Sequence, residues 1–149
     1  MDNKISCSNN HILVGLGGTG GKILRAFKMR MFEEFPTQEE RAKQPVSLLY
    51  VDSTDEMMPQ DGKARADFRV MGQDASFTQN EFLNIKAVDV EHILDHIGNY
   101  PSVKGIVNNV GAVKSAIGSL GQAAGQKRRA GSLLFAANAV GFVNSLRDA

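Results

Sequence analysis

The sequence predicts an α/β fold, in which a Rossmann-like parallel sheet is flanked by helices in three layers. Two apolar segments, residues 12–16 and 46–51, are typical of buried strands, and an amphipathic helix is predicted between them. A glycine-rich turn joins the first strand to that helix. Strand, helix and strand within about 40 residues make a βαβ unit, so the two strands are expected to be parallel.

Length and composition fit one domain. The chain has 149 residues, and 42% of them are hydrophobic, which is enough for a packed core. We expect a polar leader at residues 1–10 and a single domain over residues 11–149. The formal net charge of +1 argues against nucleic acid or an anionic membrane as a partner. With Cys7 as the lone cysteine and no long apolar run, we expect a cytoplasmic protein.

The elements of the βαβ unit are predicted from their apolar patterns. The first strand is short, rich in branched residues and ended by glycines. The helix ends before Pro36; its expected apolar positions are Ile23, Leu24, Phe27, Met31 and Phe35, and its expected solvent-facing positions are Lys22, Arg25, Lys28 and Arg30. Polar residues 37–44 are expected to form a connection to the second strand, which ends at the polar cluster 52–55.

Beyond the second strand the pattern is weaker. Residues 68–71 predict a third, short strand, and residues 90–97 a short helix with Asp89 at its start and Gly98 at its end. Residues 100–126 remain unassigned, and a long helix is expected from about residue 127 through Leu146. Nucleotide-binding sheets usually have five or six strands. We therefore expect a truncated, incomplete sheet, whose open edge favours self-association or a partner chain that completes it.

The turn at residues 15–22 is the most informative segment. Glycines let the backbone approach a ligand closely, and the first amides of a helix have no intrahelical acceptor. Together with the helix dipole they form an anion site, so we predict nucleotide phosphates over Gly17 to Gly21, with the Thr19 hydroxyl as a further donor. The alternative is a tight turn in which the glycines only permit close packing.

Two known phosphate loops can be compared with this turn. A Walker A loop is excluded, because Leu16 stands at its first glycine position and Ile23 where a hydroxyl is required. The dinucleotide fingerprint fits Gly15, Gly17 and Gly20, with Asp52 as the ribose acceptor. Asp52 lies 32 residues beyond Gly20, whereas the usual spacing is about 20. An NAD-, FAD- or adenylate-binding enzyme module therefore remains an alternative.

Three segments carry a resemblance to a known family. Residues 11–30, 46–58 and 121–139 resemble, in the same order, the amino-terminal part of the tubulin and FtsZ superfamily, especially its bacterial tubulin-like branch. The resemblance implies a GTPase-type amino-terminal domain that binds GTP or GDP, with Mg²⁺ possible. It implies that the turn contacts the phosphates through Gly15, Gly17, Gly18, Thr19, Gly20, Gly21 and Lys22. It implies a polar loop beside the phosphates and metal, formed by Asp52, Ser53 and Thr54. It also implies a second loop near the terminal phosphate, formed by Ala124, Gly125 and Gln126.

The sequence also departs from that family. The signature G-G-G-T-G-[ST]-G loop, which completes phosphate binding in the superfamily, does not occur in the 149 residues. The resemblance therefore implies that hydrolysis needs later parts of such proteins or a neighbouring subunit, and no catalytic residue is assigned.

Two smaller features were considered as sites. Arg128 and Arg129 are expected at the start of a helix, where cations are unfavourable unless an anion binds; the alternative is that they are simply solvated. His92 and His96 have a metal-binding spacing but no third ligand in sequence, so no metal site is predicted.

Three functions remain open at this point. The first is a guanine-nucleotide-binding domain of tubulin-like type. The second is a Rossmann enzyme module for NAD, FAD or an adenylate. The third is a non-catalytic assembly module that has lost nucleotide binding.

Overall fold

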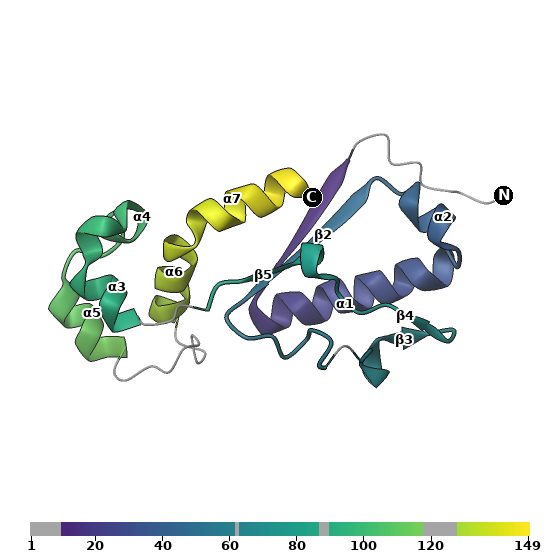
Figure 1. Ribbon diagram of the computed structural model, residues 1–149, viewed down its shortest axis with the longest axis horizontal. Helices are drawn as coiled ribbons and strands as arrows, with labels where there is room; N and C mark the ends of the chain where they lie inside the picture. Colours follow the sequence, from purple (N-terminus) through teal and green to yellow (C-terminus); the bar gives the residue numbers. More distant parts are fainter. Residues whose placement is uncertain (1–9, 62, 87–89, 118–127) are drawn as a thin grey trace.

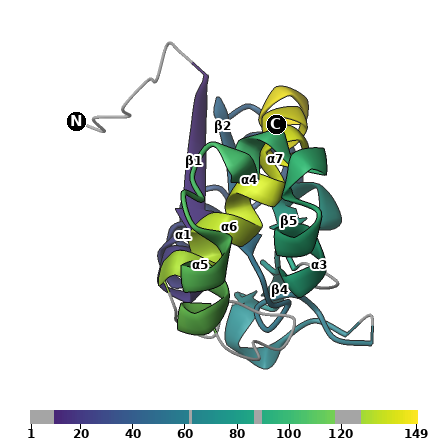
Figure 2. The same cartoon turned by 90° about the vertical axis from the view of Figure 1, so that its left-hand side faces the viewer.

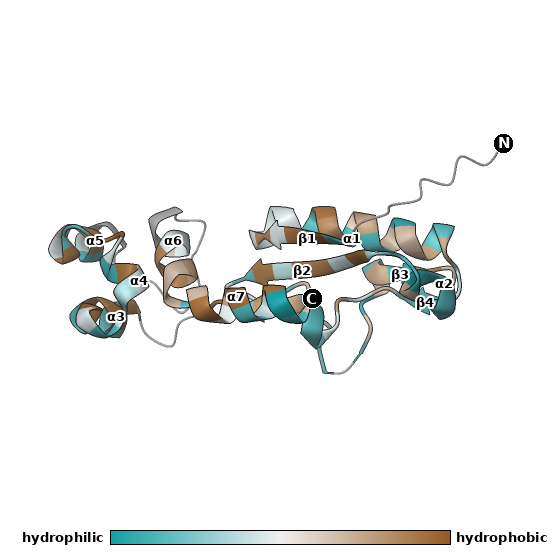
Figure 3. Cartoon of the chain, turned by 90° about the horizontal axis from the view of Figure 1, so that it is seen from above, coloured by the Kyte–Doolittle hydropathy of each residue, from teal (hydrophilic) through white to brown (hydrophobic). Residues whose placement is uncertain are grey.

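The computed structural model describes residues 10–61, 63–86, 90–117 and 128–149. Its main sheet has three parallel strands in the order β1–β2–β5, namely β1 (His11–Leu16), β2 (Val46–Asp52) and β5 (Phe82–Asn84). Helix α1 (Gly17–Glu34) packs on one face of the sheet, and α7 (Ala139–Asp148) lies along the other (Figures 1 and 3). Helix α6 (Arg128–Ala137) lies beyond the carboxyl ends of the strands. The predicted α/β fold is confirmed.

The predicted βαβ unit is present. β1 and β2 pair in parallel from His11 opposite Val46 to Leu16 opposite Val51. The crossover contains α1 and a second helix, α2 (Gln38–Ala42), where the sequence had suggested only a connection. A capping box between Thr37 and Glu40 explains why this short polar segment is helical.

The short third strand expected at residues 68–71 is present, but it does not join the main sheet. A 3₁₀ turn, η1 (Ala66–Phe68), leads into β3 (Arg69–Val70), which forms a separate antiparallel pair with β4 (Gln73–Asp74). The third strand of the main sheet is β5, which follows η2 (Gln79–Glu81) and pairs with the end of β2. Three residues are too few to show an alternating pattern, so β5 left no signal in the sequence.

Short helices gather at one end of the molecule (Figures 1 and 2). They are α3 (Val90–Asp95), η3 (Ile97–Asn99), α4 (Pro101–Lys104) and α5 (Val110–Ile117). The helix predicted over residues 90–97 therefore ends early, at Asp95; Asp89, its expected cap, lies outside the described residues. The unassigned segment 100–126 contains α4 and α5.

The long carboxy-terminal helix is two helices rather than one. The break falls at Asn138, whose side-chain amide donates to the carbonyls of Leu134 and Ile85. A side chain that bonds the backbone in this way competes with regular helix geometry. Within the described ranges, no helix is long and apolar enough to cross a membrane.

The core has two clusters, one on each face of the sheet. Leu48 and Tyr50 of β2 pack with Leu24 of α1, while the alternate residues Leu49 and Val51 pack with α3, α4 and α6. This alternation follows from the two-residue period of a strand. Both faces of β2 are therefore buried, as the continuous apolar run in its sequence predicts.

β1 lies at the edge of the sheet and pairs only with β2 among the described strands. On the face away from α1, Ile12, Val14 and Leu16 are exposed by 42%, 39% and 59%. α7 contacts β5 instead. The expectation of a domain over residues 11–149 with an incomplete sheet stays a prediction, and the leader at residues 1–10 lies outside the described residues except for Asn10.

Lys28 departs from its expected solvent-facing position. Its ammonium is buried, donates to the carbonyl of Ser76 at 2.8 Å, and forms an ion pair with Glu81. It also lies 5.6 Å from the centre of the Phe77 ring. These contacts tie α1 to the segment that leads into β5, so the pair helps to hold the third strand in place.

We expect Lys28→Met to lower the free energy of unfolding by about 2 kcal/mol, because it leaves the Glu81 carboxylate without its cation in a largely buried place. Urea denaturation measures this change. Lys43→Met is the matched control, since Lys43 and Glu39 form an ion pair with 67% and 81% of their side chains exposed. That pair is expected to contribute little. Equal effects of the two substitutions would contradict the prediction.

Candidate functional site

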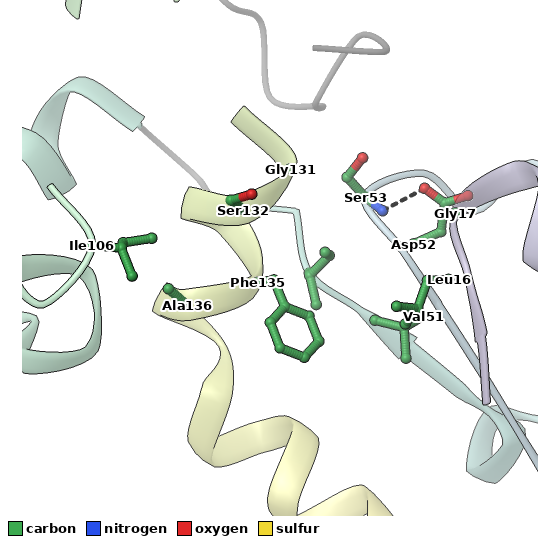
Figure 4. A pocket seen from close by; sticks show the side chains of 11 residues that line it. Leu16, Gly17, Val51, Asp52, Ser53, Ile106, Gly131, Ser132, Phe135 and Ala136 are labelled. Carbon is green, nitrogen blue, oxygen red and sulfur yellow. Dashed lines mark hydrogen bonds between the residues drawn. The ribbon is translucent and has the colours of Figure 1, made fainter. Parts of the chain in front are cut away.

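A cavity of about 660 Å³ lies between the carboxyl ends of β1 and β2 and the side of α6 (Figure 4). Ligands of open parallel sheets bind at this edge. Polar and apolar residues line it on both sides. The sheet side consists of Leu16, Gly17, Val51, Asp52, Ser53 and Ile85. The helix side consists of Gly131, Ser132, Phe135 and Ala136 from α6, together with Ile106.

The glycine turn forms one corner of this cavity. α1 begins at Gly17, so most of the glycines lie inside the first helical turn rather than before it. Leu16 occupies the N-cap position with an extended backbone and no capping side chain, and the first turn has no acidic residue. The first N–H groups of an α-helix have no acceptor within the helix itself, and in α1 these include the N–H groups of Gly18 and Thr19. They therefore form a patch of partial positive charge.

The glycines of the turn fall into two groups. Gly17 has a φ of +65°, and a Cβ added to Gly17 or Gly18 would meet nothing within 4 Å. In contrast, a Cβ on Gly20 would lie 2.6 Å from the carbonyl carbon of Gly15, and one on Gly15 would lie 2.7 Å from the carbonyl oxygen of Gly20. The close-packing interpretation therefore applies to Gly15 and Gly20, whereas Gly17 and Gly18 leave open space for a ligand.

Lys22 lies apart from the Gly17 cavity. It lines a second cavity of about 470 Å³ with Arg25, Asp55, Glu56, Met57, Gln60 and Arg65. A helix advances about 100° per residue. Consequently Lys22, five positions after Gly17, lies on a different side of α1, and only the start of the predicted segment reaches the Gly17 cavity.

The β2 loop forms the opposite polar corner. Asp52 accepts hydrogen bonds from the Tyr50 hydroxyl at 2.5 Å and from the main-chain N–H groups of Ser53 and Thr54 at 2.6 and 3.4 Å. Figure 4 shows Asp52 beside Gly17, with its bond to Ser53. Burial, together with the bond to Asp52, raises the pKa of the Tyr50 hydroxyl well above its usual range. Tyr50 therefore remains a proton donor to this carboxylate.

The sequence model of the family described as tubulin like matches residues 12–149. The chain belongs to the tubulin-like family. The match includes β1, the glycine turn, the β2 loop and α6, so every wall of the cavity comes from the tubulin-like region. Comparisons with curated proteins and with solved structures found no match.

The structure of this tubulin-like chain brings together part of the predicted site. Gly17, Asp52 and Ser53 line one cavity, and Gly18 and Thr19 follow Gly17 in the first turn of α1. Ala124, Gly125 and Gln126 lie outside the described residues, and Arg128 and Arg129 are placed only as the first two residues of α6. Within the described ranges, no cluster of three or more metal-ligand side chains is present.

The site of the tubulin-like chain also contains residues that the sequence interpretation missed. Gly131 and Ser132 line the cavity from the first half of α6, with Phe135 one turn later. They fall in the segment 121–139 that resembles the superfamily, which was the available signal. The cavity-lining side of α6 is not evident from the sequence, because it depends on how the helix lies relative to the sheet.

Proposed function

We propose that this tubulin-like chain binds a guanine nucleotide, GTP or GDP, with the phosphates on the amino terminus of α1. The observation that supports this proposal is the start of α1, whose first N–H groups have no acceptor within the helix and where no side chain caps the helix and no acidic residue lies in the first turn. Resemblance to the bacterial tubulin-like branch supports the choice of guanine. The NAD-, FAD- or adenylate-binding module stays the alternative, with Asp52 as the ribose acceptor.

Each polar corner has a distinct role in this proposal. The N–H groups of the turn donate to phosphate oxygens, and the bare backbone at Gly18 allows those oxygens to approach. Asp52 repels a phosphate directly, so it suits a cation or a hydroxyl of the ligand. Mg²⁺, when bound with the nucleotide, supplies the positive charge that lets phosphate and Asp52 share the cavity. Ala124, Gly125, Gln126, Arg128 and Arg129 are proposed to approach the terminal phosphate.

Hydrolysis is proposed to depend on a neighbouring subunit or on later parts of a longer protein. The described cavity offers Asp52 as its only ionisable side chain, and its oxygens are already engaged as acceptors. We therefore assign a binding role and no catalytic residue.

Thermal unfolding with GTP, ATP and NAD tests the proposed function. A ligand at 100 times its Kd stabilises the folded state by about 2.7 kcal/mol, which raises the Tm of a domain of this size by several degrees. GTP is expected to give the largest shift. A shift with NAD alone would favour the dinucleotide module. No shift with any of the three would contradict nucleotide binding and leave an assembly module.

We propose a second copy of this chain as the partner at the open edge of β1. The exposed side chains Ile12, Val14 and Leu16 would be covered there, and the unpaired edge of the strand would gain hydrogen bonds. Sedimentation velocity is expected to show concentration-dependent dimers, and Ile12→Lys is expected to shift the chain to monomers. Monomers of the unsubstituted chain at all concentrations would point instead to a different partner chain.

The proposed setting is cytoplasmic. The lone cysteine, Cys7, cannot form a disulfide within the sequence, which suits a reducing compartment. No nucleic acid or membrane partner is proposed, because the charged residues nearly balance.

A further inference from the structure

Tyr50 lies in the core on the α1 face of the sheet and bonds Asp52, which lines the cavity. The ring is fully buried and stacks between Phe77 and Phe82, with centroid distances of 5.3 and 5.2 Å. A Cβ added to Gly21 would lie 2.7 Å from the Tyr50 ring, so the first turn of α1 rests directly on it. At its other end, the hydroxyl holds Asp52.

Asp52 continues this chain of contacts into the β2 loop. One carboxylate oxygen accepts from Tyr50, and the other accepts from the main-chain N–H groups of Ser53 and Thr54. Such bonds to a charged acceptor are stronger than neutral ones. The start of α1, Tyr50, Asp52 and the first residues of the loop are therefore linked without a gap.

The position of this carboxylate matters because of its neighbour. Asp52 and Gly17 line the same cavity, and the N–H groups at the start of α1 attract anions. Aspartate is also a favoured helix cap. A carboxylate released from Tyr50 would be drawn toward the amino terminus of α1, where it would compete with any ligand anion.

We propose that Tyr50 is a positioning residue, which holds the Asp52 carboxylate on the β2 loop and so keeps the amino terminus of α1 open for an anion. Tyr50 is fully buried and does not line the cavity, so no contact with the ligand is proposed for it. The ligand half of this inference rests on the proposed function, whereas the positioning half is a property of the unliganded chain.

Hydrogen exchange of the unliganded protein tests the positioning. Tyr50→Phe keeps the ring and removes only the hydroxyl; Tyr100→Phe is the matched control, because Tyr100 lies among the helices at the other end. We expect the Ser53 amide to exchange at least about fivefold faster in Tyr50→Phe and unchanged in the control. Unchanged exchange in a folded Tyr50→Phe protein would overturn the proposal. If that variant does not fold, Tyr50→Met, which also lacks the hydroxyl, is measured in its place, with the same expected and overturning results.

A double-mutant cycle on GTP affinity tests the ligand half. Where Asp52 is present, Tyr50→Phe is expected to weaken GTP binding about tenfold. In the Asp52→Ala background the same substitution is expected to have no effect on GTP binding, because no carboxylate is left to compete with the phosphates. An equal loss in both backgrounds would show that the hydroxyl acts only through stability, which overturns the inference. Failure of the unsubstituted chain to bind GTP rejects the proposed function instead, and the exchange result then decides the positioning by itself.

Discussion

Gly18→Val is expected to weaken GTP binding by at least about 100-fold while the protein stays folded. The fold tolerates the change, because a Cβ at Gly18 meets nothing within 4 Å. A branched side chain there would nevertheless occupy the space above the first N–H groups of α1, where the phosphates are proposed to lie. Isothermal titration measures the affinity, and circular dichroism checks that the variant folds.

Gly98→Val is the matched control for this experiment. Gly98 lies in η3, among the helices at the far end of the molecule, and a Cβ there also meets nothing within 4 Å. Its substitution is expected to leave GTP affinity unchanged. If folded Gly18→Val protein bound GTP as well as the control does, the phosphates would not lie on this turn.

Gly20→Val is expected to abolish folding or to lower the free energy of unfolding by more than about 4 kcal/mol. Its Cβ would lie 2.6 Å from the carbonyl carbon of Gly15, and backbone atoms cannot move aside as a flexible side chain can. Urea denaturation of Gly20→Val beside Gly18→Val measures the difference between neighbouring glycines. Similar stability in the two variants would contradict the close packing of β1 on α1.

These two predictions separate the interpretations of the glycine turn. Gly15 and Gly20 let a strand and a helix approach each other, which is a packing role. Gly17 and Gly18 leave the helix start open, which is what a ligand requires. The two explanations of the motif therefore hold at different positions of one turn.

The fold was predictable where the pattern is local. Apolar residues in β1, α1 and β2 recur at the period of their own element, so the sequence alone defines the βαβ unit. β5 was not predictable, because its three residues become a strand only through pairing with the end of β2. The burial of Lys28 was equally hidden, since its partner Glu81 lies 53 residues away. Long-range contacts of this kind leave no periodic signal.

The candidate site was predictable to a similar extent. Gly17, Asp52 and Ser53 follow parallel strands, and the carboxyl ends of such strands meet at one edge. Lys22 lines the second cavity, and its proposed contact with phosphate stays a prediction. Gly131 and Ser132 were missed, because their position depends on how α6 lies beyond the strand ends.

The most direct test of anion binding at the start of α1 is a titration of the ¹⁵N-labelled chain with GTP, observed by NMR. The amide resonances of Gly17, Gly18 and Thr19 are expected to move most, as hydrogen bonds form to phosphate oxygens. Saturable binding with the largest shifts elsewhere, for example around Lys22 and Arg25 in the second cavity, would contradict the account, as would an unchanged spectrum at millimolar GTP.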